Sequence, residues 1–225
     1  MSVPFAVLAS GSGTNMQALL DREERGAAYR IEVLVVDRPC AAEGRARGRG
    51  RAVRRIDFGQ PDAGARVLAV LRRHGVRGIL LAGFLKLLPA EVCRAYRNRI
   101  LNIHPALLPS FGGKGMYGGR VHQAVLDSGA KLSGPTIHFV NERYDEGRIL
   151  AQWPVPVLPE DTARSLAARV LEVEHLLYPA AADALARGVA DGRDGTPRFR
   201  WPGTDAQGGA DLWESIRNAF GGAVE

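Results

Sequence analysis

The sequence predicts an α/β fold in which a mainly parallel sheet carries helices on both faces and ends in antiparallel strands. In the first half of the chain, short apolar runs alternate with segments whose apolar residues recur at helical spacing, which is typical of β-α-β units. In the second half, strand-like runs at 136–141 and 149–157 are separated by only seven residues. That is too short for a helical crossover, so we expect antiparallel pairing. No repeat or clear linker is visible, so we expect one domain over 1–203 and a tail over 204–225.

The first half contains five predicted strands, of which the third is the weakest. They lie at 5–9, 31–36, 53–56, 77–82 and 100–103. A Gly-rich turn after the first strand leads into a predicted helix at 15–24. A second helix is predicted at 62–74, where Val67, Val70 and Leu71 stand at helical spacing, and a third runs from Pro89 to Tyr96.

The second half begins with a loop that holds five glycines between residues 112 and 119. A helix is predicted at 121–127, before the two antiparallel strands, and a long helical pattern covers 162–187. Beyond Gly188 the chain is rich in Gly, Asp and Pro. There we expect a strand at 198–201 and an amphipathic helix at 211–220.

The composition is that of an ordinary soluble protein: 225 residues, of which 46% are hydrophobic and 24% charged. The net charge is +6, and the arginine run at 45–55 has no interleaved aromatic residue, so we expect no nucleic-acid partner. No apolar run could span a bilayer and the N-terminus lacks a basic signal region, so we expect no membrane partner. Cys40 and Cys93 lack motif spacing and no metal-ligand cluster is visible. We therefore expect a cytoplasmic protein without a metal.

The turn after the first strand, residues 9–15, has the features of a phosphate-binding loop. Its glycines let the backbone turn tightly, and the helix that follows presents unpaired N–H groups and a partial positive charge. It is not a Walker A loop, and it only half-resembles a dinucleotide fingerprint because Met16 replaces the third glycine. A purely structural turn, with Thr14 or Asn15 as a helix cap, remains an alternative.

The strand at 100–103 ends in the most informative stretch of the chain. Asn102 and His104 point to the same face because strand side chains alternate, and Pro105 places them at the carboxyl end, where open α/β sheets bind ligands. An amide and an imidazole there can stabilise a developing oxyanion. Asp145, in a predicted turn, is a candidate to hold the imidazole charged, although Asp is also common in ordinary turns. The spacing alone does not bring Asp145 to His104.

Taken together, five stretches resemble the folate-dependent phosphoribosylglycinamide formyltransferases of the single-domain type. They occur in the order typical of the family, over roughly residues 5–190. The stretches are Ser10-Gly-Ser-Gly-Thr-Asn15, Leu81-Ala-Gly-Phe-Leu-Lys-Leu-Leu-Pro89, Leu101-Asn-Ile-His-Pro-Ala-Leu-Leu-Pro-Ser-Phe111, His138-Phe-Val-Asn-Glu-Arg-Tyr-Asp-Glu-Gly147 and Glu174-His-Leu-Leu-Tyr-Pro179. The resemblance implies a formyltransferase-type Rossmann-like sheet. It also implies transfer of a formyl group from 10-formyltetrahydrofolate to the amine of N1-(5-phospho-D-ribosyl)glycinamide, a step of purine biosynthesis.

The resemblance also assigns roles to individual residues. The catalytic trio would be Asn102, His104 and Asp145. The residues that bind the ribonucleotide would be Gly13, Thr14, Asn15, Leu171, Glu172, Val173 and Glu174. Those that bind the folate would be Leu85, Lys86, Leu87, Leu88, Asn102, Asn141, Glu142, Arg143, Tyr144 and Asp145. The chain departs from the family pattern at Asp37, at Pro135 and in the long glycine loop.

In the implied reaction the amine attacks the formyl carbon, and Asn102 and protonated His104 donate hydrogen bonds to the oxyanion that forms. We expect Asp145 to raise the pKa of His104. The partners would be small molecules, and the protein a monomer or homodimer. Two alternatives stay open: another folate-dependent formyltransferase or hydrolase of the same fold, and a nucleotide-binding module without catalysis. The chain is too short after about residue 190 for the second domain of the transfer-RNA formyltransferases, and its first strand starts too early for a deformylase's regulatory domain.

Overall fold

The computed structural model describes residues 2–191 of the chain. The strand predicted at 198–201, the helix predicted at 211–220 and the 204–225 tail lie outside the described residues. The prediction of one domain over 1–203 therefore stays a prediction.

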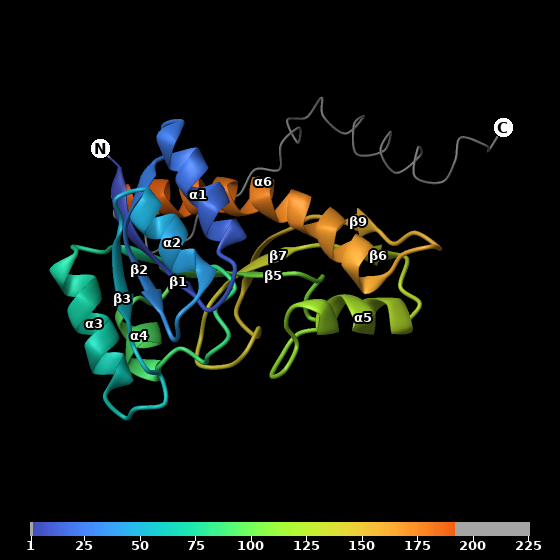
Figure 1. Cartoon of the computed structure of the whole chain (residues 1–225), viewed down its shortest axis with the longest axis horizontal. Helices are drawn as coiled ribbons and strands as arrows, with labels where there is room; N and C mark the ends of the chain where they lie inside the picture. Colours follow the sequence, from blue (N-terminus) through green and yellow to red (C-terminus); the bar gives the residue numbers. More distant parts are fainter. Residues whose placement is uncertain (1, 192–225) are drawn as a thin grey trace.

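A seven-stranded sheet forms the centre of the fold, in the order β3-β2-β1-β4-β5-β7-β8 (Figure 1). Its first five strands are parallel, and β7 and β8 are antiparallel to their neighbours. The strands are β1 (Val3–Ala9), β2 (Tyr29–Val36), β3 (Ala52–Arg55), β4 (Gly78–Leu81), β5 (Ile100–His104), β7 (Thr136–Phe139) and β8 (Ile149–Gln152). The predicted α/β architecture is confirmed.

Helices cover both faces of the sheet, which explains why β1 and β4 are almost continuously buried. On one face α1 (Thr14–Glu24), α2 (Ala41–Gly48) and α6 (Ala163–Ala190) pack on a core that includes Tyr29 and Tyr178. On the other face lie α3 (Ala63–Arg73) and α4 (Ala90–Ala95). The helix α5 (Gly119–Asp127) packs against α6 beside a third apolar cluster.

The structure corrects two sequence predictions. First, α2 was not predicted, because its only buried apolar side chains are two small ones, Ala42 and Ala46, among glycines and arginines. Second, the predicted strand at 149–157 is two strands. After β8 the chain passes Pro154, which has no N–H to donate to the sheet, and β9 (Val155–Pro156) pairs instead with the unpredicted β6 (Leu132–Ser133). Within residues 2–191 no helix is long and apolar enough to cross a membrane.

Candidate active site

The predicted trio converges at the carboxyl end of β5. Asn102 and His104 lie on this strand, which ends at His104, and Asp145 lies in the connection between β7 and β8. The Asn102 Nδ2 atom is 3.5 Å from Asp145 Oδ1, and the His104 Nδ1 atom is 3.6 Å from Asp145 Oδ2. The Asp145 backbone is in the left-handed region, with φ 57°. A single carboxylate therefore faces both side chains of β5.

A fourth side chain, His138, belongs to this group and was missed in the sequence. It lies on β7 directly opposite Asn102 in the antiparallel pairing. Its Nε2 atom is 3.0 Å from Asn102 Nδ2 and 3.5 Å from Asp145 Oδ1. The only available signal was its position in a stretch shared with Asp145, because the register that places it opposite Asn102 depends on tertiary structure.

Electrostatics at the trio depart from the expectation in one respect. Burial of the His104 ring lowers its pKa below the ordinary value, although Asp145 and the hydrogen bond with Phe111 both act to raise it. Asp145 does act in the expected direction, but desolvation outweighs it. Burial also acts to raise the pKa of Asp145, yet the contacts with His138, His104 and the N–H of Gly113 lower it overall, so this carboxylate is ionised at neutral pH.

Both proposed oxyanion donors already have acceptors within the protein. The His104 Nε2 atom is 2.8 Å from the carbonyl oxygen of Phe111, and the Asn102 amide faces His138 and Asp145. The two oxygens of Asp145 have different donors. Oδ1 faces the Asn102 amide, and Oδ2 accepts from the Gly113 N–H at 2.9 Å. The donors must exchange one of these partners for a ligand atom when they act on a substrate.

The predicted phosphate loop opens α1 at the carboxyl end of β1. The cap of this helix is Gly13 itself, with φ 74° and no side-chain cap, so the alternative in which Thr14 or Asn15 caps the helix is wrong. A Cβ at residue 13 would lie 2.8 Å from Ala42, so α2 closes against this turn. The first N–H groups of α1 have no acceptor within the helix and remain available to an anion.

Asn15 connects this loop to α6. Its Nδ2 atom donates to Glu174 Oε2 at 2.6 Å, although the two residues are 159 positions apart. Burial raises the pKa of Glu174 to about 7, against the hydrogen bond from Asn15, which lowers it. Of the other residues predicted on α6, Val173 packs on the cluster between α5 and α6, Leu171 is half-buried and Glu172 is exposed.

The two predicted folate-side segments, 85–88 and 141–145, approach each other through Cys93 on α4. The thiol lies 3.8 Å from the carbonyl oxygen of Leu88 and 3.5 Å from that of Asn141. The N–H of Leu85 donates to Ser10 Oγ at 3.0 Å, which ties the first segment to the end of β1. Of the remaining residues in these segments, Leu87, Arg143 and Glu142 lie at or near the surface, as do Lys86 and Tyr144.

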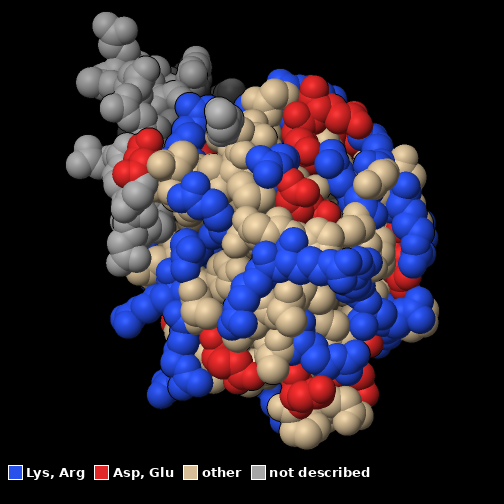
Figure 2. All heavy atoms as spheres, turned by 90° about the vertical axis from the view of Figure 1, so that its left-hand side faces the viewer, with Lys and Arg blue, Asp and Glu red and all other residues tan. Residues whose placement is uncertain are grey.

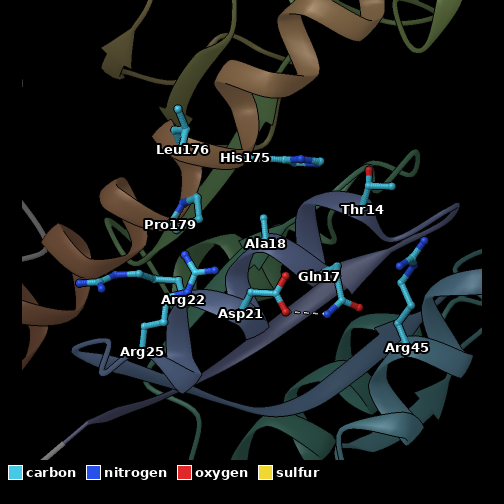
Figure 3. Close-up of a pocket in the computed structure, with 10 residues that line it drawn as sticks. All are labelled: Thr14, Gln17, Ala18, Asp21, Arg22, Arg25, Arg45, His175, Leu176 and Pro179. Carbon is cyan, nitrogen blue, oxygen red and sulfur yellow. Dashed lines mark hydrogen bonds between the residues drawn. The ribbon is translucent and has the colours of Figure 1, made fainter.

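A pocket of about 400 Å³ adjoins the phosphate loop between α1 and α6 (Figure 3). Its walls come from α1, α2 and α6. They are formed by Thr14, Gln17, Ala18, Asp21, Arg22, Arg25, Arg45, His175, Leu176 and Pro179. Arg45 also donates to the carbonyl oxygen of Ser12 at 2.9 Å, a contact that the sequence did not reveal. The pocket does not include the trio, so it extends the phosphate side of the site and not its reacting end. Among residues 2–191 no group of three or more His, Cys, Asp or Glu side chains is placed to hold a metal ion.

Comparison with known proteins gives consistent similarities. Residues 3–182 match the formyl transferase family. The chain is 49% identical over 181 residues to a chloroplastic phosphoribosylglycinamide formyltransferase of Arabidopsis thaliana, covering 77% of this chain and 62% of that protein. It is 46% identical over 200 residues to the Vigna unguiculata counterpart, covering 86% and 64%. The chain thus spans somewhat less than two thirds of these relatives.

Solved structures show the same architecture. Glycinamide ribonucleotide transformylase 1 from Symbiobacterium toebii superposes with a TM-score of 0.77 at 38% identity, covering 83% of this chain and 89% of that one. A formyltetrahydrofolate deformylase from Pseudomonas syringae has a TM-score of 0.75 at 23% identity, covering 83% and 62%. The second likeness extends to the fold alone.

Proposed function

The chain belongs to the formyl transferase family, and from this premise we propose that it formylates glycinamide ribonucleotide. The donor would be 10-formyltetrahydrofolate and the acceptor the amine of N1-(5-phospho-D-ribosyl)glycinamide. The products would be N-formylglycinamide ribonucleotide and tetrahydrofolate, in de novo purine biosynthesis. The observation that supports this most is the placement of Asp145 against both Asn102 and His104 at the end of β5.

The two halves of the proposed site lie along one edge of the sheet. The phosphate loop follows β1 and the trio follows β5, and these strands are both parallel to β4, which lies between them. Their carboxyl ends therefore face the same side. A ribonucleotide whose phosphate binds at Gly13 and whose ribose meets Glu174 would extend along this edge toward Asn102.

In the proposed reaction the substrate amine attacks the formyl carbon of the donor, and the carbonyl oxygen takes the negative charge. Asn102 and His104 supply the nearest donors for that oxygen, His104 by turning from the Phe111 carbonyl. One such donor is typically worth about 100- to 1,000-fold in rate. The intermediate collapses when the bond between the formyl carbon and the folate nitrogen breaks. The proton lost by the amine passes to that nitrogen.

The test is an assay of the purified protein with both substrates, following formylated ribonucleotide and tetrahydrofolate together. Equal formation of the two products is expected. Release of formate without the ribonucleotide would favour a hydrolase of the same fold. Binding of the ribonucleotide without binding of folate analogues would favour a module without catalysis. His104→Ala serves as the inactive control.

We further propose that the protein is a cytoplasmic monomer or homodimer that acts on small molecules without nucleic acid. Free thiols at Cys40 and Cys93 support a reducing location. The face of the molecule in Figure 2 carries many Lys and Arg side chains, with Asp and Glu side chains among them. In the arginine run at 45–55 most guanidinium groups pair with carboxylates of the same chain, which leaves little free charge for a phosphate backbone.

A further inference from the structure

The Asn102 carboxamide is held on one side by two groups that accept hydrogen bonds. Its Nδ2 atom lies 3.0 Å from His138 Nε2 and 3.5 Å from Asp145 Oδ1. The contact with His138 is the shorter, and it joins directly opposed residues of β5 and β7. The orientation of the amide is therefore set chiefly from β7.

The contact of the other ring nitrogen of His138 determines whether Nε2 donates to Asn102 or accepts from it. Its Nδ1 atom is 2.9 Å from the carbonyl oxygen of Phe139, which can only accept, so Nδ1 holds the hydrogen. In the neutral ring Nε2 then has a lone pair and accepts from Asn102, whereas a charged ring would instead donate from Nε2 to Asp145 Oδ1, 3.5 Å away. A Cβ at Gly147 would lie 1.6 Å from the Phe139 oxygen and 3.4 Å from Nδ1, so the backbone packs directly against this arrangement. The ring is buried and has little freedom to turn.

We propose that His138 is a positioning residue that fixes the donor end of the Asn102 carboxamide toward the reacting carbonyl. The inference rests on the proposed function. His138 takes one of the two amide hydrogens at 3.0 Å. The second is only loosely directed to Asp145 at 3.5 Å, and it becomes the donor to the oxyanion. Without His138 the carboxamide can turn over, and its oxygen would then face both the carboxylate of Asp145 and the forming oxyanion.

The first experiment is a double-mutant cycle measured by kcat. His138→Phe keeps a ring but removes the acceptor, and we expect it to lower kcat about 10- to 100-fold, less than complete loss of an oxyanion donor. The KM values of both substrates should change less than about threefold. In an Asn102→Ala background the same exchange should change kcat less than about twofold, because no amide is left to orient. His138→Gln offers an acceptor oxygen and should restore part of the rate.

Two results would overturn the proposal. A full effect of His138→Phe in the Asn102→Ala background would show that His138 does not act through the amide. An effect that disappears instead in an Asp145→Asn background would assign it to the carboxylate. His74→Phe, the same exchange at the histidine that follows the last residue of α3, is the matched control for loss of an imidazole.

A second measurement does not depend on the reaction. Nitrogen NMR of the labelled protein should show His138 with its hydrogen on Nδ1, and the Asn102 amide resonances should shift in His138→Gln. A hydrogen on Nε2 of neutral His138 would refute the inference even if formyl transfer is found. If the wild type fails to transfer formyl groups, the proposed function fails while the NMR result still decides the orientation of the amide.

Discussion

Replacing Asp145 with Asn tests whether this carboxylate acts by supporting charge on His104. The exchange keeps the shape of the side chain and removes its charge. Asn tolerates the left-handed backbone at this position, where φ is 57°, better than most residues. Its carboxamide oxygen can still accept from the Gly113 N–H, which now lies 2.9 Å from Oδ2. The loop should therefore stay in place.

The size of the effect follows from the 3.6 Å separation of His104 Nδ1 and Asp145 Oδ2. An opposite charge within this range typically raises a pKa by about one to three units. Burial already lowers the pKa of His104, and loss of Asp145 lowers it further. Below both pKa values the ring is charged in each protein, so the rates should be similar. As pH rises through the window between them the variant loses its proton first, and the deficit in kcat should level off at about 10- to 1,000-fold.

The assay is kcat for wild type and Asp145→Asn from about pH 4 to 9, a range that extends below the lowered pKa of His104, with the KM of the ribonucleotide measured at each pH. That KM should change little, because ribonucleotide binding is assigned to the loop at Gly13 and to Glu174. Glu146→Gln removes an exposed charge from the same loop and should leave the profile unchanged. Parallel profiles for wild type and Asp145→Asn would refute charge support and indicate that Asp145 orders the loop or a water, without affecting the formyltransferase proposal.

Three further exchanges test the rest of the site. Gly13→Ala places a Cβ 2.8 Å from Ala42 at a φ of 74°, so unfolding in urea should show a loss of about 1–3 kcal/mol and the ribonucleotide KM should rise. Glu174→Gln should be more stable than wild type at pH 8 by up to about 3 kcal/mol. Folding raises the pKa of Glu174 from 4.5 to about 7, so the wild type loses stability as pH rises through 7 and the variant does not. A difference in stability that persists unchanged at pH 4 would contradict this. Tyr178→Phe removes a buried hydroxyl that lies 2.9 and 3.1 Å from two strand carbonyls, and calorimetry should show a loss of about 1–3 kcal/mol; an unchanged melting temperature would refute its role.

The parallel half of the fold could be predicted because β1, β4 and the second half of β2 are apolar runs that are buried on both faces. The elements that were missed lack such a signal. The helix α2 depends on tertiary contacts, since its buried Glu43 accepts from Arg47 and Arg55 and stabilises a segment with little apolar surface. The strands β6 and β9 have two residues each, too few for any periodicity.

The site residues also fall into those with a local sequence signal and those that depend on tertiary contacts. Strand alternation alone placed Asn102 and His104 on one face, because both belong to β5. The partners of these residues come from distant segments, with Asp145 43 positions beyond Asn102, and no local pattern specifies such pairs. The resemblance to a known family supplied Asp145, while His138 required the register of β5 and β7. Asp145 acts to raise the pKa of His104 as predicted, but burial of the ring lowers this pKa overall, and the extent of burial depends on tertiary packing.

The helix α6 gives the two halves of the site a common support. Tyr178 lies on its buried face, with its hydroxyl between the carbonyl oxygens of Leu81, at the end of β4, and Leu101, near the start of β5. Glu174, one turn earlier and on the same face, accepts from Asn15 in the phosphate loop. Because these two side chains share one helix, the proposed ribonucleotide end of the site is fixed in position relative to the strand that presents Asn102. A change at Tyr178 should therefore lower kcat as well as stability, whereas a change at Glu174 should alter stability and the KM of the ribonucleotide more than kcat.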